Sequence, residues 1–371
     1  MEPSEDQIAG ARLAKLFTTA SEEFESLLAT NDLDQKIESG ALPARNFGRA
    51  LDYAIASAYG DGQTEDEAHL FLQRVLYRIN RLKFFWYDDL DHYKNERSDY
   101  LRGVRDRIEL RWEPWELRQC GCAIHAKDVT RALRERAAED VAPSPAPEGI
   151  YFRDEMGVAG YRRLLEIASL DGLVEASQLS RTLGGVANEI HAMMTRLLVE
   201  EYGGGRLSRK HSSFFTHMLE ELGIDATPEA HFDVLPWQVL ATINHSFLLS
   251  ERKRFYLRYV GGLLYTEVSV PAAFENYRRA AERLGMSEKA RGYWDLHIKE
   301  DERHGRWMLN DVALPLAARY PRHAMEIVVG YDQQKFMSSR AGRATADAVK
   351  RVDQRERMVS VRHTPSFEAA A

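Results

Sequence analysis

The sequence predicts an all-α protein, and three observations support that fold class. Long segments repeat apolar residues at spacings of three and four, which places them on one face of a helix. Almost no segment alternates apolar and polar residues with period two, as a half-exposed strand would. The breaks between the periodic segments carry glycines typical of helix ends, at 203–205 and at Gly285. We therefore expect helices and no sheet.

The first part of the chain is expected to form an N-terminal helical domain, residues 1–140. Its apolar repeats predict helices at 8–30, 43–59, 64–86, 91–111, 115–126 and 127–140. The composition then changes, because residues 141–149 contain three prolines and a glycine, which do not fit a helix interior. We predict a proline-rich linker at 141–150 and a domain boundary there.

A second helical domain is expected at 151–352. Its repeats predict helices at 157–170, 173–183, 185–202, 208–222, 235–250, 252–284, 287–320 and 322–351. Thr227-Pro228 and Leu235-Pro236 mark turns between them. Residues 353–371 are polar and aperiodic, so we expect a flexible tail.

Composition excludes several classes of protein. The net charge of -7 lacks the basic excess that a nucleic-acid partner requires. No apolar run approaches the roughly 18 residues needed to cross a membrane, and the acidic N-terminus is unlike a signal peptide. We expect a cytoplasmic protein with neither a nucleic-acid nor a membrane partner.

The only two cysteines are Cys120 and Cys122. A gap of one residue is poor for a disulfide, and two thiols near His125 fall short of the four ligands of a structural zinc site. We expect neither, and a reducing compartment is the simplest inference.

The most informative motif is His297-x3-Asp301-x2-His304. Positions i, i+4 and i+7 lie on one face of a helix, so two imidazoles and a carboxylate converge over roughly two turns. Three such groups on one stripe suit iron or manganese. An exposed polar helix face is the alternative explanation.

Glu267 is the first candidate for a further ligand. It lies in the otherwise apolar stretch 260–271, where a lone carboxylate is costly to bury unless it is paired or bound to a cation. Gly261 and Gly262, in the same stretch, would allow another backbone to approach closely. A glutamate that reaches solvent is the alternative.

Glu201 and His211 are the next candidates. Glu201 ends one predicted helix and His211 opens the next, and the glycines between them allow both to point to one centre. Glu200 would replace Glu201 if the helix register differs, and His217 would equally serve in place of His211. A ferritin-like bundle is disfavoured, because its two Glu-x-x-His pairs are absent.

Together, Glu201-x9-His211, Glu267 and the His297 motif resemble the ligand set of the haem-oxygenase-like diiron oxidases and oxygenases, the iron-containing redox enzymes. The resemblance covers residues 152–351 and includes neighbouring sequence segments such as Asp171-Gly-Leu-Val-Glu175. It implies a haem-oxygenase-like helical bundle with an N-terminal helical extension. It also implies two Fe(II) ions, with dioxygen as co-substrate and an external reductant.

Carried over by position, the resemblance assigns metal ligands to individual residues. Glu201, His211 and His304 become candidates for one iron, and His297 and Asp301 for the other, with Glu267 bridging or nearby. Glu175 falls where an N-oxygenating member places an additional carboxylate ligand; a surface glutamate is the alternative. Only a short polar tail follows Arg351, so we expect no cupin domain of the kind that follows in that member.

The resemblance implies a non-haem diiron oxygenase that activates dioxygen. We favour N-oxygenation of a small amine- or guanidine-like natural-product precursor, because the long architecture and Glu175 resemble the N-oxygenating branch. The alternative is a diiron oxidase that performs oxidative C–C cleavage, decarboxylation or desaturation of an amino or fatty acid. A haem-binding or metal-free protein of the same scaffold, and a helical interaction protein without catalysis, also remain open.

Two partners follow from the same resemblance. The N-terminal helices resemble the dimerisation element of longer members, so a homodimer is expected, although Trp86, Trp112 and Trp115 would equally suit a core. The chain has no dinucleotide fingerprint and no iron–sulfur cysteine set, so electrons are expected from an external electron donor.

Overall fold

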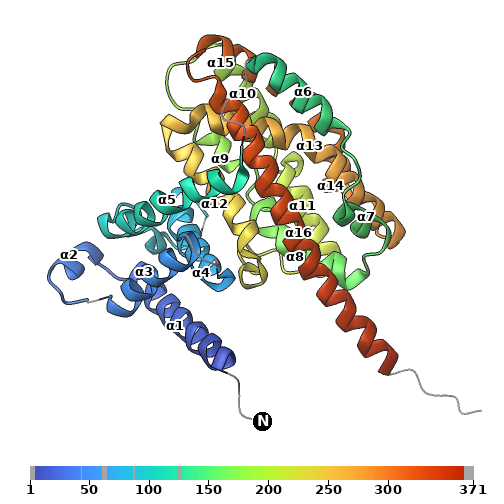
Figure 1. Cartoon of the computed structure of the whole chain (residues 1–371). Helices are drawn as coiled ribbons and strands as arrows, with labels where there is room; N and C mark the ends of the chain where they lie inside the picture. Colours follow the sequence, from blue (N-terminus) through green and yellow to red (C-terminus); the bar gives the residue numbers. More distant parts are fainter. Residues whose placement is uncertain (1–4, 43, 61–64, 87, 123–127, 363–371) are drawn as a thin grey trace, which may run out of the picture. The chain divides into compact units, whose positions relative to one another are not determined.

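The computed structural model describes residues 5–42, 44–60, 65–86, 88–122 and 128–362. Within these ranges the regular elements are helices and no strand occurs, so the all-α prediction is confirmed (Figure 1). The chain divides into two compact units. One comprises Met1–Gly121 with Ile243–Leu248, and the other comprises Cys122–Thr242 with Leu249–Ala371.

The first unit is built around aromatic side chains. Its helices are α1 (Glu5–Leu28), α2 (Leu33–Glu38), α3 (Arg45–Tyr59), α4 (Asp66–Asn80) and α5 (Asp99–Cys120), with 3-10 turns at Arg81–Lys83 and Leu90–Tyr93. Phe24 stacks on Phe47 with ring centroids 4.9 Å apart. Asn244, from the segment Ile243–Leu248, donates hydrogen bonds to the backbone and side chain of Gln73. That segment therefore contributes to the core of this unit.

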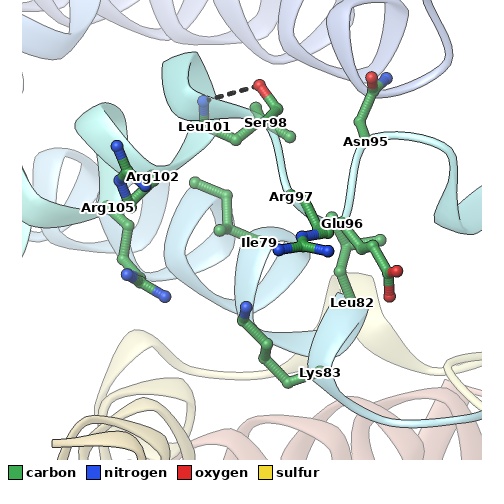
Figure 2. Close-up of a pocket in the computed structure, with 10 residues that line it drawn as sticks. All are labelled: Ile79, Leu82, Lys83, Asn95, Glu96, Arg97, Ser98, Leu101, Arg102 and Arg105. Atoms are coloured by element: carbon green, nitrogen blue, oxygen red, sulfur yellow. Dashed lines mark hydrogen bonds between the residues drawn. The ribbon is translucent and has the colours of Figure 1, made fainter.

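A pocket of the first unit lies beside the start of α5 (Figure 2). Ser98 caps the helix by accepting a hydrogen bond from the N–H of Leu101. Basic side chains and one acid line the pocket: Lys83, Glu96, Arg97, Arg102 and Arg105. Nearby carboxylates pair with two of these cations, since Asp99 contacts Arg102 and Asp106 contacts Arg105. These ion pairs offset the positive charge, so we assign the pocket no ligand.

The second unit contains the predicted metal ligands. Its helices are α6 (Val129–Val141), α7 (Pro147–Asp154), α8 (Val158–Gly172), α9 (Ser177–Ser180), α10 (Glu189–Glu201), α11 (His211–Glu221), α12 (Trp237–Glu251), α13 (Tyr256–Arg283), α14 (Gly292–Trp307), α15 (Leu314–Arg319) and α16 (Met325–Arg362). A π-helical segment, Met308–Ala313, joins α14 to α15.

The long helices α13 and α16 meet at two glycines. A Cβ on Gly261 would lie 1.9 Å from the carbonyl oxygen of Ile327, and one on Gly330 would lie 1.9 Å from that of Arg258. No larger residue fits at either position without moving a backbone. The predicted close approach is therefore confirmed for Gly261, whereas a Cβ on Gly262 would make only ordinary contacts.

The predicted tail from residue 353 is wrong at its start, because α16 continues to Arg362. Asp353 is buried and caps α8: its carboxylate accepts hydrogen bonds from the N–H groups of Gly157 and Gly160. It also accepts one from the hydroxyl of Tyr151. These bonds hold this part of α16 against the start of α8. The predicted tail residues 363–371 lie outside the described residues.

The unit boundary also differs from the predicted one at 140/141. Helix α6 belongs to the second unit. There, Arg136 forms a bidentate ion pair with Asp332, and Tyr331 donates a hydrogen bond to Asp140. The predicted linker 141–150 is helical from Pro147 onward, because proline is well tolerated at the first position of a helix. The dimerisation role of the N-terminal helices stays a prediction.

Three helix boundaries differ from the periodicity. The segments 91–111 and 115–126 were predicted as separate helices, but α5 runs from Asp99 to Cys120 with Pro114 inside. The predicted helix 173–183 is reduced to Ser177–Ser180. The predicted helix 287–320 is divided into α14, the π-helical segment and α15. The spacing of apolar residues alone does not predict where these helices are interrupted.

Cys120 and Cys122 are joined in a disulfide, contrary to the sequence prediction. Gly121 between them has a φ of 58°, the left-handed conformation that ends α5. The turn thus reverses the chain locally and brings the two sulfur atoms together. The inference of a reducing compartment therefore loses its support. Among the described helices, none is long and apolar enough to cross a membrane.

Candidate metal centre

The seven predicted ligands come from five segments of the second unit. Glu175 lies in the turn between α8 and α9, Glu201 ends α10, His211 begins α11, Glu267 lies within α13, and His297, Asp301 and His304 lie along α14. Six of the seven are buried, and Glu175 is partly buried. The exposed fractions of His297, Asp301 and His304 are 4%, 3% and 0%. The α14 stripe therefore faces the interior, and the alternative of an exposed polar face is excluded.

One group of ligand atoms surrounds the imidazole of His297. Its Nε2 lies 2.8 Å from Oε1 of Glu175 and 3.1 Å from Nδ1 of His211. That Nδ1 lies 2.8 Å from Oε2 of Glu201. One ligand atom from each of these residues lies within 4.8 Å of the others, which suits a single cation. We call Glu175, Glu201, His211 and His297 the first ligand group.

A second group surrounds the imidazole of His304. Its Nδ1 lies 3.3 Å from Oε1 of Glu201, 3.4 Å from Oε2 of Glu267 and 3.5 Å from Oδ1 of Asp301. We call Glu201, Glu267, Asp301 and His304 the second ligand group. Glu201 contributes Oε2 to the first group and Oε1 to the second. One carboxylate thus lies between two candidate metal positions.

This grouping differs from the division implied by the resemblance. His304 was expected to share a metal with His211, and Asp301 with His297. The structure instead places His211 beside His297, and Asp301 beside His304. Asp301 and His304 are three residues apart on α14, so they are closer neighbours along the stripe than His297 and His304. Glu201, rather than Glu267, contributes an oxygen to each group, whereas Glu267 was expected to bridge the metals or lie nearby.

The hydrogen bonds of the other ring nitrogens orient two of the imidazoles. Nδ1 of His297 lies 2.8 Å from the carbonyl oxygen of Tyr293 and donates its proton to it, so Nε2 is the nitrogen that would present a lone pair to a metal in the first group. Nε2 of His304 lies 3.0 Å from Oε2 of Glu200 and donates its proton to it, so Nδ1 is the nitrogen that would present a lone pair to a metal in the second group. Metal-bound imidazoles in proteins commonly have such a partner on the second nitrogen.

Several buried atoms of the site lack a hydrogen-bond partner. They are Nδ1 of His304, Oδ1 of Asp301 and Oε2 of Glu175. A buried polar atom without a partner is costly, and buried carboxylates that face one another need a cation. The donor set of carboxylate oxygens and imidazole nitrogens suits iron. The residues present therefore fit the metal that the resemblance implies.

The pKa values of the site depend on this clustering of acids. Burial raises the pKa of Glu267 to about 7, and the charges of Asp301 and Glu201 add to that shift. Burial alone would lower the pKa of His297, but the nearby carboxylates, led by Glu175, raise it to about 10. The pKa of His304 is raised well above its ordinary value by its carboxylate neighbours. Without metal, protons on these groups offset the negative charge.

Sequence reasoning missed Tyr293 as a supporting residue. Its hydroxyl donates a hydrogen bond of 2.8 Å to Oε1 of Glu175, and its carbonyl oxygen accepts from His297. Tyr293 thus supports two members of the first group. Its position four residues before His297, on the same helix face, was the available signal.

Glu200 and His217 were alternatives to the assigned ligands. Glu200 faces Nε2 of His304, on the side away from the second group, whereas Glu201 faces Nδ1. His217 is exposed and takes no part in either ligand group. The structure therefore favours Glu201 and His211.

A third set of possible ligands, Glu200, Glu300 and His304, lies on the outer side of His304. Both glutamates are only partly buried, and Arg303 forms ion pairs with both. A cation already neutralises this set, unlike the two ligand groups. The two groups that share Glu201 are therefore the better candidates for a metal site than this outer set.

Two comparisons with known proteins cover the segment that contains this candidate centre. Residues 162–333 match the family model described as iron-containing redox enzyme. Nitrosourea synthase from Streptomyces achromogenes subsp. streptozoticus is 24% identical over 226 residues, which are 61% of this chain and 48% of that protein. The chain thus spans about half the length of this relative. All seven predicted ligands fall within residues 162–333, the segment that is similar to the iron-containing redox enzymes.

Proposed function

We propose that this protein binds two iron ions and uses dioxygen to oxidise a small amine- or guanidine-like substrate at nitrogen. The observation that carries the proposal is the pair of buried ligand groups that share Glu201. A single metal would leave one group of buried carboxylates without a cation.

The donor set favours iron over zinc. The two groups together offer four carboxylates and three imidazoles and no thiolate. Zinc sites are mostly four-coordinate and rich in sulfur or imidazole, whereas carboxylate-rich sites with more ligands suit ferrous iron. When bound, two ferrous ions together supply two electrons to dioxygen. Further turnover then needs an external electron donor.

The protein holds the first group in an apolar, aromatic setting. Phe274 contacts the ring of His297 edge to face, with centroids 5.3 Å apart, and Phe215 packs in the same way against Tyr293. These rings exclude water from one side of the site, which strengthens electrostatic interactions there. Glu175, the partly exposed ligand, marks the side from which a substrate would approach.

Two observations support oxidation at nitrogen. The matched relative is named for making a nitrosourea, a product in which nitrogen carries oxygen. Within this chain, Asp171 lies at the end of α8, four residues before Glu175, and its side chain is exposed. A carboxylate near the approach side would attract a cationic amine or guanidine.

The proposal is tested with protein that is purified without oxygen and loaded with ferrous iron. We expect two iron ions per chain by colorimetric assay, and a mass gain of one or more oxygen atoms on an amine or guanidine substrate after exposure to oxygen. His211→Ala should abolish this gain, whereas His217→Ala, on the same helix but exposed, should retain it.

Other outcomes would contradict parts of the proposal. Loss of carbon from an amino or fatty acid, without oxygen gain on amines, would replace N-oxygenation by oxidative cleavage. A Soret absorption band and no loosely held iron would indicate haem. Failure to bind two metals would overturn the diiron centre itself.

A further inference from the structure

We propose that Glu200 is a positioning residue for the second metal: it fixes the ring of His304 so that Nδ1 faces Glu201, Glu267 and Asp301. The inference rests on the proposed function, because it assumes that a metal occupies the second ligand group. It assigns a role to a residue outside the seven predicted ligands.

The geometry around Glu200 supports this role. Its Oε2 lies 3.0 Å from Nε2 of His304 and accepts the ring N–H. The same oxygen accepts a hydrogen bond of 2.6 Å from Arg303, and the second oxygen, Oε1, lies 3.4 Å from Nε of Arg196. Two guanidinium groups thus hold the carboxylate while it holds the imidazole.

Trp307 anchors the two arginines. Its ring lies 4.0 Å from the guanidinium carbon of Arg196 and 5.0 Å from that of Arg303. The ring also stacks on His304, with centroids 5.8 Å apart and planes 29° apart. Cation–π contacts of this kind restrict a long side chain. The carboxylate that accepts the hydrogen bond from His304 is therefore itself held by two arginines that pack on Trp307.

The two hydrogen bonds that orient the imidazoles differ in the charge of their acceptors. His297 donates to a neutral backbone carbonyl, that of Tyr293. His304 donates to a carboxylate, and hydrogen bonds to ionised acceptors are roughly twice as strong as neutral ones. A carboxylate partner also makes the imidazole a better donor to a metal. Glu200 therefore contributes to metal affinity as well as to orientation.

A competing explanation is that Glu200 is itself a ligand, in the set with Glu300 and His304. The two explanations differ for Glu300. Glu300 also pairs with Arg303, but it lies outside both ligand groups. The hydrogen bond of the His304 ring goes to Glu200 and not to Glu300. Glu300→Gln is therefore a matched control: it weakens metal binding only if the outer set is the site.

The test measures cobalt(II) binding to the metal-free protein, with a chromophoric chelator as competitor. We expect wild-type protein to bind two cobalt ions, and Glu200→Ala to weaken one of them by about 10- to 100-fold. Glu200→Gln keeps an acceptor oxygen for His304, so it should weaken that ion by less than about tenfold. Glu300→Gln should leave both affinities within about threefold of wild type.

A spectroscopic measurement reports on the hydrogen bond directly. In cobalt-loaded wild-type protein, the Nε2 proton of His304 should give a hyperfine-shifted proton resonance that exchanges slowly with water. Glu200→Gln should retain this resonance, and Glu200→Ala should lose it through faster exchange. A residue that merely stabilised the fold would not produce this pattern.

The outcomes separate this inference from the proposed function. If wild-type protein binds no pair of metals, the diiron proposal fails. If it binds two, and both Glu200 variants keep wild-type affinities and the resonance, only the role of Glu200 is overturned. Equal weakening by Glu300→Gln and Glu200→Ala would overturn it in favour of the outer set. Should Glu200→Ala unfold, as judged by circular dichroism, Glu200→Ser takes its place: its short side chain cannot reach His304, so wild-type affinity and a retained resonance in that variant would overturn the role of Glu200.

Discussion

Two buried aspartates of the second unit have opposite surroundings. Asp353 and Asp301 are both 3% exposed. The carboxylate of Asp353 accepts three hydrogen bonds, from Gly157, Gly160 and Tyr151. Oδ1 of Asp301 has no hydrogen-bond partner and faces Nδ1 of His304 across 3.5 Å.

This difference separates a structural carboxylate from a ligand. A buried charge that is fully hydrogen-bonded stabilises the fold, as in the cap of α8. A buried charge that lacks partners is kept only where another group neutralises it. The comparison therefore assigns Asp353 to folding and Asp301 to metal binding, and each assignment predicts a different response to mutation.

The largest expected effect is on metal affinity at Asp301. Asp301→Asn removes a charged ligand from the second group, so affinity for one of the two irons should fall by at least about 100-fold, beyond the usual effect of an outer-shell partner. The metal-free protein should be as stable as wild type or more stable, because one of several crowded carboxylates is gone. Iron titration and thermal unfolding measure the two quantities.

Asp295→Asn is the control for Asp301, since Asp295 lies on α14 but is exposed and pairs with Arg291. It should leave iron affinity unchanged. A marked loss of stability in metal-free Asp301→Asn, with both irons retained, would place Asp301 in the same class as Asp353.

The next effect is on folding at Asp353. Asp353→Ala leaves one buried and one partly buried N–H group and one hydroxyl without an acceptor, so the free energy of unfolding should fall by about 3 kcal/mol. Denaturant titration measures the change. The variant should still bind two metals while folded.

Asp347→Ala serves as the control, because Asp347 is an exposed residue of the same helix, and it should change stability by less than about 0.5 kcal/mol. A stability loss of Asp353→Ala no larger than that of the control would remove the structural role from Asp353.

The smallest effect is a pH dependence that only the metal site should produce. The folded-state pKa values of His297, about 10, and Glu267, about 7, both lie above the ordinary values of these groups. The folded metal-free protein therefore holds protons that the unfolded chain releases, and its stability should fall as pH rises from about 6 to 9. Metal binding displaces the same protons, so stabilisation by iron should grow over that range.

Thermal unfolding with and without metal at several pH values measures this dependence. Glu267→Gln should reduce the pH dependence of the metal-free protein's stability near pH 7. A metal-free melting temperature that rises from pH 6 to 9 would contradict the clustering of acids described here.

The sequence predicted much of this site because its signals are local. The spacing of His297, Asp301 and His304 follows from helix geometry, and Glu267 was conspicuous in an apolar segment. The sharing of Glu201 between two groups was not predictable, because it depends on how the ends of α10 and α11 pack against α14. The role of Glu200 was hidden for the same reason: neighbouring glutamates look alike in sequence but face opposite nitrogens of His304.

The fold was predictable in class but less so in its boundaries. Periodicity identifies the long helices, whereas the prolines of 141–149 predict a linker although Pro147 begins α7. The continuation of α16 past residue 351 depends on Asp353, whose partners lie almost 200 residues away in the sequence. Long-range contacts of this kind leave no trace in local composition.

The central claim is that two metals lie on either side of Glu201. Anomalous diffraction at the iron edge, from crystals of iron-loaded protein, tests it most directly. We predict two peaks per chain about 3.5–4 Å apart, one among Glu175, His211 and His297 and the other among Glu267, Asp301 and His304. A single peak, or a peak on the outer side of His304 between Glu200 and Glu300, would contradict the account.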